Sequence, residues 1–259
     1  MNIAVLIKQV PDTWSERTLR ETDWTLDRDA ADAVIDEIDT RGVETALQLV
    51  EKFGGTVTVV TMGPERATEA LRKALAMGVD EAVHISDEGL AGSCALQTSA
   101  ALAAAIRPLS PDLVIAGNES TDGRTGSVPS MLAERLGMPQ VTSIRSLEVV
   151  GGTLRAERVK DGGYSEVSAP LPAVISVTEK INEPRYPGFK GIMAAKKKKV
   201  VTLGIADLGL DPSGTGLAHA STAVVDGAPR PPRQGGEKFT DDGTGGTRIA
   251  EFLAAQRLL

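Results

Sequence analysis

Cysteine, histidine and aromatic residues are scarce in this chain of 259 residues, which has 1 Cys, 2 His, 2 Trp, 2 Tyr and 4 Phe. The lone Cys94 cannot form an internal disulfide bond, so nothing points to an oxidising compartment, and a cytoplasmic protein is expected. His84 and His219 support neither a catalytic triad nor a metal centre, because both need several converging side chains. We expect no catalytic residue and no metal site, and any redox chemistry would have to be carried by a cofactor.

Long apolar runs are also missing. Runs such as residues 100–106 fall far short of the roughly 20 residues that a membrane-spanning helix needs, and residues 3–7 are too few for a signal peptide. No membrane insertion is expected. The formal net charge of -7 argues against a general nucleic-acid-binding protein, because such proteins rely on many lysine and arginine contacts to phosphates.

Apolar runs of strand length alternate with helical patterns in the first half of the chain. Strands are predicted at residues 3–7, 56–62, 81–86 and 112–117, and the all-apolar runs are typical of strands buried on both faces of a parallel sheet. Helices are predicted at residues 30–53, between Pro64 and Gly78, and at residues 95–106. This alternation predicts an α/β fold with a mostly parallel, doubly wound sheet and right-handed crossovers.

The pattern changes after Leu136. Residues 141–150, 154–159 and 164–168 predict an antiparallel hairpin region with turns at glycine pairs, and residues 172–180 predict another buried strand. From residue 200 onward come one more apolar run, a Gly/Ser/Pro-rich stretch and a terminal helix at residues 248–258. We therefore predict an α/β domain over residues 1–199 and an extended C-terminal arm over residues 200–259.

A candidate ligand site follows the strand that ends near residue 117. Residues 116–137, AGNESTDGRTGSVPSMLAERLG, combine a strand end, a glycine-rich loop and a helix start, and open α/β sheets bind ligands at such strand ends. Gly123 and Gly126 would let backbone amides approach a phosphate near the positive end of the helix. The loop matches neither common nucleotide motif, so an ordinary connecting loop is an equally good interpretation. The strand ends at residues 6–8 and 62–64 would complete a nucleotide-sized crevice.

Residues 182–199, NEPRYPGFKGIMAAKKKK, stand out from their surroundings. They place Phe189 among proline and glycine residues and end in consecutive lysines, although the chain is acidic. The simpler interpretation has Phe189 packed into its own domain and the lysines solvated, and the residues alone slightly favour it. The alternative is an apolar anchor for a pocket on another protein, with the lysines attracting an acidic face.

Several longer motifs make the chain similar to one known family. They are IKQVPD at residues 7–12, ALAMGVDEAVHI at 74–85, GNESTDGRTGSVP at 117–129, LPAVISVTEKINEPR at 171–185 and INEPRYPGFKGIMAAKKKK at 181–199. The N-E-P-R-[YF] pattern combined with I-M-x-A-K-K-K is long and specific. Over nearly its whole length the chain resembles the beta subunit of electron transfer flavoprotein.

The resemblance implies a universal-stress-like, adenine-nucleotide-binding fold and a heterodimer with an alpha subunit that holds most of the FAD. The beta subunit would hold a structural AMP. Such a carrier is not an enzyme: it accepts electrons from acyl-CoA dehydrogenases and other flavoprotein dehydrogenases, as in fatty acid oxidation, and passes them to the electron transfer flavoprotein-quinone oxidoreductase.

Two sets of residues follow from the resemblance. The implied AMP site consists of Leu6, Ile7, Lys8, Asp36, Glu37, Ile38, Asp39, Met62, Gly117, Asn118, Thr121, Asp122, Gly123, Arg124, Thr125 and Gly126. The family's recognition loop corresponds to residues 177–199. Its implied contacts with the dehydrogenase are Phe189 as the anchor together with Tyr186, Pro187, Ile192, Met193, Lys196 and Lys197.

Two alternatives remain open on the sequence. Family members that bifurcate electrons bind a second FAD where others bind AMP, and the overall pattern favours AMP here. A stand-alone ATP- or AMP-binding sensor of the universal-stress type would have a similar sheet and loop but no flavin partner. The chain also departs from some members: it has Thr13 and Ile38 where they place aromatics near the flavin, and Val159 where they carry a glutamate that holds the flavin domain.

Overall fold

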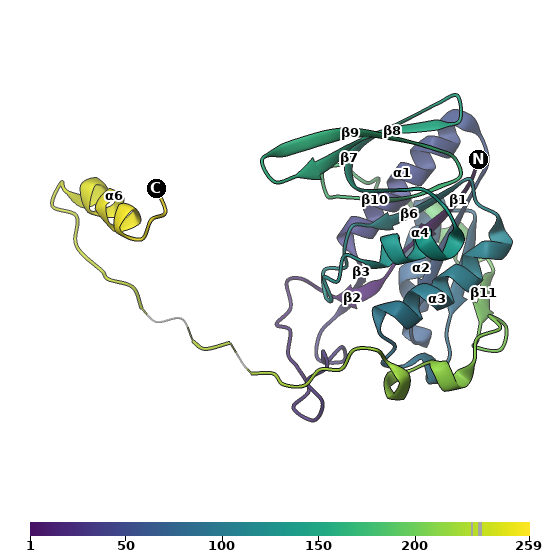
Figure 1. Ribbon diagram of the computed structural model, residues 1–259, viewed down its shortest axis with the longest axis horizontal. Coiled ribbons are helices and arrows are strands. Elements are labelled where there is room, and N and C mark those ends of the chain that lie inside the picture. The colour runs from purple at the N-terminus through teal and green to yellow at the C-terminus, as the bar shows by residue number, and fades with distance from the viewer. Residues whose placement is uncertain (229, 233–234) are drawn as a thin grey trace. The chain divides into compact units, whose positions relative to one another are not determined.

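The computed structural model describes residues 1–228, 230–232 and 235–259 (Figure 1). The chain forms two compact units, Met1–Val225 and Asp226–Leu259. The first contains the whole central sheet, and the second contains helix α6 (Gly245–Ala255). Among the described residues, no helix is both long and apolar enough to cross a membrane.

A nine-stranded sheet forms the centre of the first unit. Its order is β11-β5-β4-β1-β6-β10-β7-β8-β9, and all neighbours from β11 to β7 run parallel, whereas β7, β8 and β9 pair antiparallel. The bounds of these strands are β1 (Asn2–Leu6), β4 (Thr56–Met62), β5 (Glu81–Ile85), β6 (Leu113–Gly117), β7 (Gln140–Val150), β8 (Thr153–Lys160), β9 (Gly163–Pro170), β10 (Ala173–Val177) and β11 (Val200–Leu203). The predicted mostly parallel α/β fold with an antiparallel hairpin region is confirmed.

Helices cover both faces of the parallel part of the sheet, as the doubly wound prediction requires. The longer helices of the first unit are α1 (Glu37–Phe53), α2 (Thr68–Met77), α3 (Ala95–Ile106), α4 (Val128–Leu136) and α5 (Phe189–Ala195). The short 3-10 helices are η1 (Glu65–Ala67), η2 (Glu88–Leu90), η3 (Arg107–Leu109), η4 (Pro212–Gly214) and η5 (Leu217–His219). Two separate buried clusters result, because successive strand residues face opposite sides of a sheet.

The two clusters divide neighbouring residues of the same strands between them. Val5 of β1 and Ile115 of β6 pack with Leu71 of α2 in one cluster. Val114 of β6 packs with Leu102 of α3 in the other. These strands are therefore buried on both faces, which is why their sequences are apolar throughout rather than alternating.

The predicted helix at residues 30–53 begins later than expected. Residues 33–35 form β3 (Ala33–Ile35), which pairs antiparallel with β2 (Gln9–Pro11), a short strand that the sequence did not reveal. Asp36 then caps α1, because its carboxylate accepts a hydrogen bond from the N–H of Ile38 at 3.1 Å. The apolar side chains of residues 33 and 35 fitted a helical stripe, but pairing with β2 and the cap at Asp36 decide the local structure.

The C-terminal part of the chain is also divided differently from the prediction. β11 pairs with β5 inside the main sheet, and the compact unit extends to Val225, so the predicted boundary at residue 199 does not coincide with this division. The predicted terminal helix at residues 248–258 corresponds to α6. Residues 229 and 233–234 of the predicted arm lie outside the described residues.

Candidate nucleotide crevice and docking surface

The carboxyl ends of β1, β4 and β6 lie side by side at one edge of the sheet, because these strands are parallel neighbours. Leu6 ends β1 and Ile7 follows it, and both are buried, with 8% and 4% of their surface exposed. Lys8 follows directly, and Gly117 and Asn118 end β6 and begin the glycine-rich loop. The structure thus brings together the strand ends that the sequence assigned to one crevice.

Asp36 joins the start of α1 to the glycine-rich loop. It is fully buried. One carboxylate oxygen caps α1, and the other accepts hydrogen bonds from the N–H and the hydroxyl of Thr121, at 2.7 and 3.0 Å. The backbone N–H of Asp36 in turn donates to the carbonyl of Lys8 at 2.9 Å. Through its side chain and its backbone, this one residue therefore fixes the position of the loop relative to the helix and to the residue that follows β1.

Asp39, in the first turn of α1, lies against the end of β6. Its carboxylate accepts a hydrogen bond from the N–H of Lys8 at 2.7 Å. Burial, reinforced by the neighbouring Asp36 charge, raises the pKa of Asp39 well above its usual value, although hydrogen bonds from the N–H groups of Lys8 and Gly117 oppose that shift. A protonated Asp39 would repel an anionic ligand less than a charged one.

Asp122 is held between two cations. Its side chain has no exposed surface, and its oxygens lie 2.8 Å from Lys8 Nζ and 2.6 Å from an Arg28 nitrogen. Burial alone would raise the pKa of this carboxyl, but the Lys8 charge and hydrogen bonds from Lys8, Ser120 and Arg28 outweigh it and hold the pKa well below its usual range. Asp122 is thus ionised and fixes the glycine-rich loop on Lys8.

Arg28 and Arg17 bind the glycine-rich loop, although the sequence did not single them out. Arg17 donates to the carbonyl of Thr121 at 2.6 Å, and Arg28 binds Asp122. Both arginines come from the polar stretch between β2 and β3, which has no periodicity. The stretch is rich in charged residues, but nothing in the sequence distinguishes these two arginines from its other charged side chains.

The tip of the loop, residues 123–126, is exposed at the start of α4. Arg124 and Gly126 have positive φ angles of 48° and 66°, and such turns direct successive N–H groups to one side. Within the described residues, the N–H groups of residues 125–127 make no hydrogen bond to the protein. These amides, together with the positive end of α4, form a suitable environment for a phosphate group.

Asn118 has a buried side-chain oxygen without any hydrogen-bond partner among the described residues, and so does the hydroxyl of Thr61 in β4. Buried polar atoms are nearly always satisfied, and each exception needs an explanation. Asn118 lies in the loop of the crevice, so a hydrogen-bond donor on a bound ligand would satisfy its oxygen. An adenine amino group and a ribose hydroxyl are such donors.

The remaining members of the implied AMP site contribute less to this network. Glu37 is exposed in the first turn of α1, and Ile38 is partly buried beside Gly117. Met62 is partly buried at the end of β4 and packs against the cluster on the α3 face. Their side chains can bound a crevice but offer it no charge other than that of Glu37.

The docking segment of residues 182–199 contains a helix, α5, rather than an open loop. Tyr186 and Phe189 are 96% and 80% exposed, and Ile192 and Met193 are each 44% exposed. Pro187 is partly buried, and Lys196 and Lys197 are exposed. The interpretation that Phe189 packs into its own domain was therefore wrong. An apolar surface beside lysines is instead open to solvent within the described structure.

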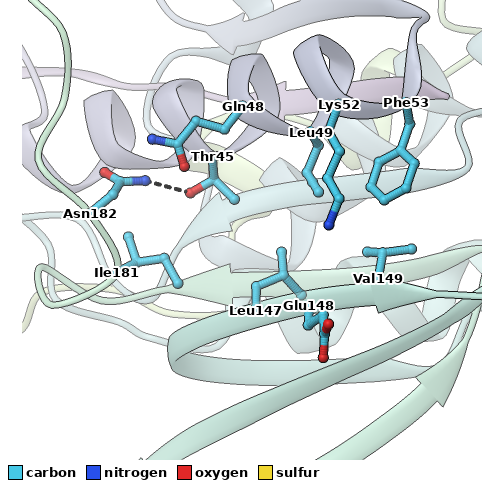
Figure 2. A pocket seen from close by; sticks show the side chains of 10 residues that line it. All are labelled: Thr45, Gln48, Leu49, Lys52, Phe53, Leu147, Glu148, Val149, Ile181 and Asn182. Atoms are coloured by element: carbon cyan, nitrogen blue, oxygen red, sulfur yellow. Dashed lines mark hydrogen bonds between the residues drawn. The ribbon is translucent and has the colours of Figure 1, made fainter.

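A separate groove of about 200 Å³ lies between α1 and β7 (Figure 2). Its lining residues are Thr45, Gln48, Leu49, Lys52, Phe53, Leu147, Glu148, Val149, Ile181 and Asn182. None of them belongs to the implied AMP site, and pockets for small molecules typically have volumes of roughly 300 to 1,000 Å³. This groove is not the nucleotide crevice.

The surroundings of His84 and the arrangement of possible metal ligands can be followed in the part of the chain that the structure describes. His84 lies in β5, and its ring nitrogens contact the Thr68 hydroxyl at 3.3 Å and the Gly63 carbonyl at 3.0 Å. Both ring nitrogens of His84 therefore have partners within its own domain. No group of three or more His, Cys, Asp or Glu residues is arranged to bind a metal within the same described ranges.

Comparison with known proteins points to one family. Residues 23–208 match the model of the electron transfer flavoprotein domain. The chain is 56% identical over 264 residues to the electron transfer flavoprotein subunit beta of Mycobacterium tuberculosis and of Mycobacterium leprae, covering 100% of this chain and 99% of each relative. It is 36% identical over 258 residues to the caffeyl-CoA reductase-Etf complex subunit CarD of Acetobacterium woodii, covering 99% of this chain and 97% of that protein.

Proposed function

Because the chain belongs to the electron transfer flavoprotein family, we propose that it is the beta subunit of a heterodimeric electron carrier. The observation that carries this proposal is the 56% identity to subunits of that name along the whole chain. The partner is an electron transfer flavoprotein alpha subunit, which provides most of the FAD site. Bound FAD supplies the one- and two-electron chemistry, and the side chains of this chain bind and position rather than catalyse.

We infer that the electrons come from acyl-CoA dehydrogenases and related flavoprotein dehydrogenases and leave to a quinone oxidoreductase. The exposed surface of Tyr186, Phe189, Ile192 and Met193 provides an apolar contact for the donor. Lys196 and Lys197 add positive charge next to it. Aromatic anchors at the centre of an interface typically contribute most of its binding energy.

Replacing the anchor tests this docking role. Phe189→Ala should leave the FAD content of the heterodimer unchanged and raise the KM of the dehydrogenase for the carrier, because loss of a buried anchor typically costs at least about 2 kcal/mol. The measurement is steady-state electron acceptance with the carrier as varied substrate. Unchanged kinetics would refute the assignment of Phe189 as the anchor.

We propose that AMP occupies the crevice formed by the ends of β1, β4 and β6. The free N–H groups of residues 125–127 and the start of α4 suit a phosphate. The unpartnered oxygen of Asn118 suits a donor on the base or ribose. Lys8 and the backbone around Asp36 and Gly117 would line the space between them.

The relation to the caffeyl-CoA reductase-Etf complex subunit supports a second candidate, in which a second FAD replaces AMP and the heterodimer bifurcates electrons. Co-expression with the alpha subunit from the same genome, denaturation of the yellow complex and quantification of released FAD and AMP separate the two. One FAD and one AMP per heterodimer would support the carrier. Two FAD and no AMP would support bifurcation, and a colourless protein that purifies alone with ATP would refute both.

We further propose that the C-terminal unit packs on the alpha subunit. Its helix α6 exposes 54% of Ile249 and 58% of Phe252. Their spacing of three residues places both side chains on one face of the helix, and contiguous exposed apolar surface is a mark of interaction sites. Ending the chain after Val225 should leave the first unit folded and weaken the heterodimer. Size-exclusion chromatography of the co-expressed pair measures this, and an unchanged complex would contradict the proposal.

A further inference from the structure

The segment that carries the exposed docking residues is fixed to α1 by one arginine. Arg185 Nε and one terminal nitrogen contact the two carboxylate oxygens of Glu44, at 2.7 and 3.0 Å, and its backbone N–H also reaches Glu44 at 3.2 Å. Further hydrogen bonds join Arg185 to Glu51, seven residues and about two turns later on the same helix. The planar guanidinium is thus held by two carboxylates, with the paired geometry that makes arginine contacts specific.

Glu44 has no comparable partner elsewhere in the described structure. Its side chain is 5% exposed, and only Gln48 adds a side-chain hydrogen bond, at 2.9 Å. Burial raises the pKa of Glu44, but hydrogen bonds from Arg185 outweigh this and lower it, while Glu44 and Glu51 raise the pKa of Arg185. A buried carboxylate is costly when unpaired, so Glu44 strongly favours the conformation that brings Arg185 onto α1.

Asn182 adds a second attachment to the same helix. Its amide nitrogen donates to the carbonyl of Arg41 at 3.0 Å. It also donates to the hydroxyl of Thr45 at 2.9 Å, the hydrogen bond drawn in Figure 2. Arg41 in turn donates to the carbonyl of Asn182. The chain is therefore immobilised on α1 immediately before Tyr186 and Phe189, the two most exposed aromatics of the docking segment.

The other end of the segment is fixed to α2. Arg72 donates to the carbonyls of Ala195 and Lys198, at 2.7 and 2.6 Å, and so satisfies the C-terminal end of α5. The four exposed apolar side chains lie between this attachment and the one made by Arg185. Side chains held in place before binding lose less conformational entropy when a partner covers them.

We propose that Arg185 is a positioning residue for donor docking: through Glu44 and Glu51 it holds Tyr186 and Phe189 in the geometry that the dehydrogenase binds. The inference rests on the proposed docking function of this surface. Arg185 itself need not touch the donor or the flavin. It orders the segment before the donor binds, which reduces the conformational entropy lost on binding. Loss of Arg185 therefore weakens binding without altering the electron-transfer step.

The test uses the complete heterodimer with FAD bound. Arg185→Gln removes both the charge and the paired N–H donors of the guanidinium. Arg185→Lys keeps the charge without the paired donors. Glu51→Gln removes only the more exposed of the two carboxylates. Arg155→Gln, on an exposed residue of β8, is the matched control. The readouts are KM and kcat of a dehydrogenase with the carrier as varied substrate, and amide hydrogen exchange of residues 186–195.

Arg185→Gln should raise KM about ten-fold, the equivalent of ordering one residue, with kcat and FAD content unchanged and with faster exchange in residues 186–195. Arg185→Lys and Glu51→Gln should give smaller effects, and Arg155→Gln none. A normal KM for Arg185→Gln beside a raised KM for Phe189→Ala would overturn the positioning role alone. Normal values for both would refute docking at this surface. If Arg185→Gln loses FAD or does not fold, the KM of Glu51→Gln becomes the test. A normal KM for Glu51→Gln would then overturn the inference.

Discussion

Asp122 is the residue whose charge most tightly joins the parts of the candidate nucleotide crevice. Its buried carboxylate links Lys8, which follows β1, to Arg28 from the polar stretch between β2 and β3. Because its pKa in the folded protein is depressed, the carboxylate is ionised at every pH at which the protein is expected to work. The interaction stabilises the fold only while Asp122 is charged.

Asp122→Asn should therefore lower stability in a pH-dependent way. In the unfolded chain the pKa of an aspartic acid is about 3.9. The stabilisation is therefore fully present above about pH 5, and it is lost as the pH falls through the unfolded pKa towards the depressed folded pKa. At pH 7 the loss should be about 1.5 to 2 kcal/mol, the lower part of the range for hydrogen bonds to charged groups, because Lys8 and Arg28 are 40% and 37% exposed. Urea unfolding at pH 7, 5 and 4 measures it.

The control for this prediction is Asp161→Asn, on an exposed residue of the turn between β8 and β9. It should behave as the unmodified protein at each pH. The difference between Asp122→Asn and the unmodified protein should be equal at pH 7 and 5 and smaller at pH 4. A difference that does not change with pH would show that the charge of Asp122 contributes nothing.

Gly117→Ala tests the close contact between β6 and α1. A methyl group at this position would lie 2.7 Å from Asp39 Oδ1 and 3.1 Å from Ile38 Cγ2, and Asp39 is held by the N–H of Lys8. Overpacking of this kind typically costs about 1 to 3 kcal/mol, and AMP recovered with the heterodimer should also fall. Gly163→Ala is the control, because its added methyl meets no atom within 4 Å. Equal stability and AMP content in the two variants would contradict the prediction.

The sequence predicted which strand ends meet at the candidate crevice, but not which side chains hold the glycine-rich loop there. The strand ends at residues 6–8, 62 and 117 could be assigned from apolar runs, because parallel strands place their carboxyl ends at one edge. Arg17 and Arg28 could not, because no periodicity relates them to the loop that they bind. The exposure of Phe189 was also beyond reach, since a proline- and glycine-rich segment is compatible with packing inwards or outwards.

Among the elements, α5 shows how a short helix is held in place by its neighbour. At Gly191 an added Cβ would overlap the carbonyl oxygen of Ala76 in α2, so the two backbones touch. Arg72 of α2 then satisfies carbonyls at the end of α5. A helix of seven residues is not stable in isolation, and these contacts with α2 supply what its own hydrogen bonds cannot.

Gly191→Ala should therefore displace α5, whereas Gly188→Ala should not. The added methyl of the first variant meets a backbone atom that cannot rotate away, and that of the second meets no atom within 4 Å. We expect trypsin to cleave Gly191→Ala at Lys190 or within residues 196–199 several-fold faster than the unmodified protein, because local opening controls proteolysis. Similar cleavage rates for both variants would refute the role of this backbone contact.

The start of α1 shows what element prediction from sequence lacked. Apolar residues at positions 33 and 35 fit both the helical and the strand periodicity, and a short apolar run cannot distinguish a helix from a strand. Two tertiary features determine the local structure of residues 33–36. One is β2, which pairs with β3 only after the chain has folded, and the other is Asp36, whose carboxylate caps α1 and binds Thr121. The central strands needed no such information, because complete burial leaves a continuous apolar run.

Over the whole molecule, the charge distribution is uneven. The chain has 35 acidic and 28 basic residues, yet four consecutive lysines follow α5, of which Lys196, Lys197 and Lys199 are exposed. A local patch of this sign attracts an acidic partner to one face, while the net negative charge disfavours contact elsewhere. Such patterns act mainly on the rate of association and the choice of face.

Lys196→Glu should reduce the association rate constant with a donor dehydrogenase several-fold at low salt and leave the dissociation rate constant almost unchanged. The effect should shrink as salt is added, because the screening length falls from about 10 Å at 0.1 M to about 3 Å at 1 M. Stopped-flow mixing across this range measures both constants. Lys160→Glu at the end of β8 makes the same change in net charge and is the control: an equal slowing in both variants would mean that total charge, rather than the patch beside Phe189, governs the encounter.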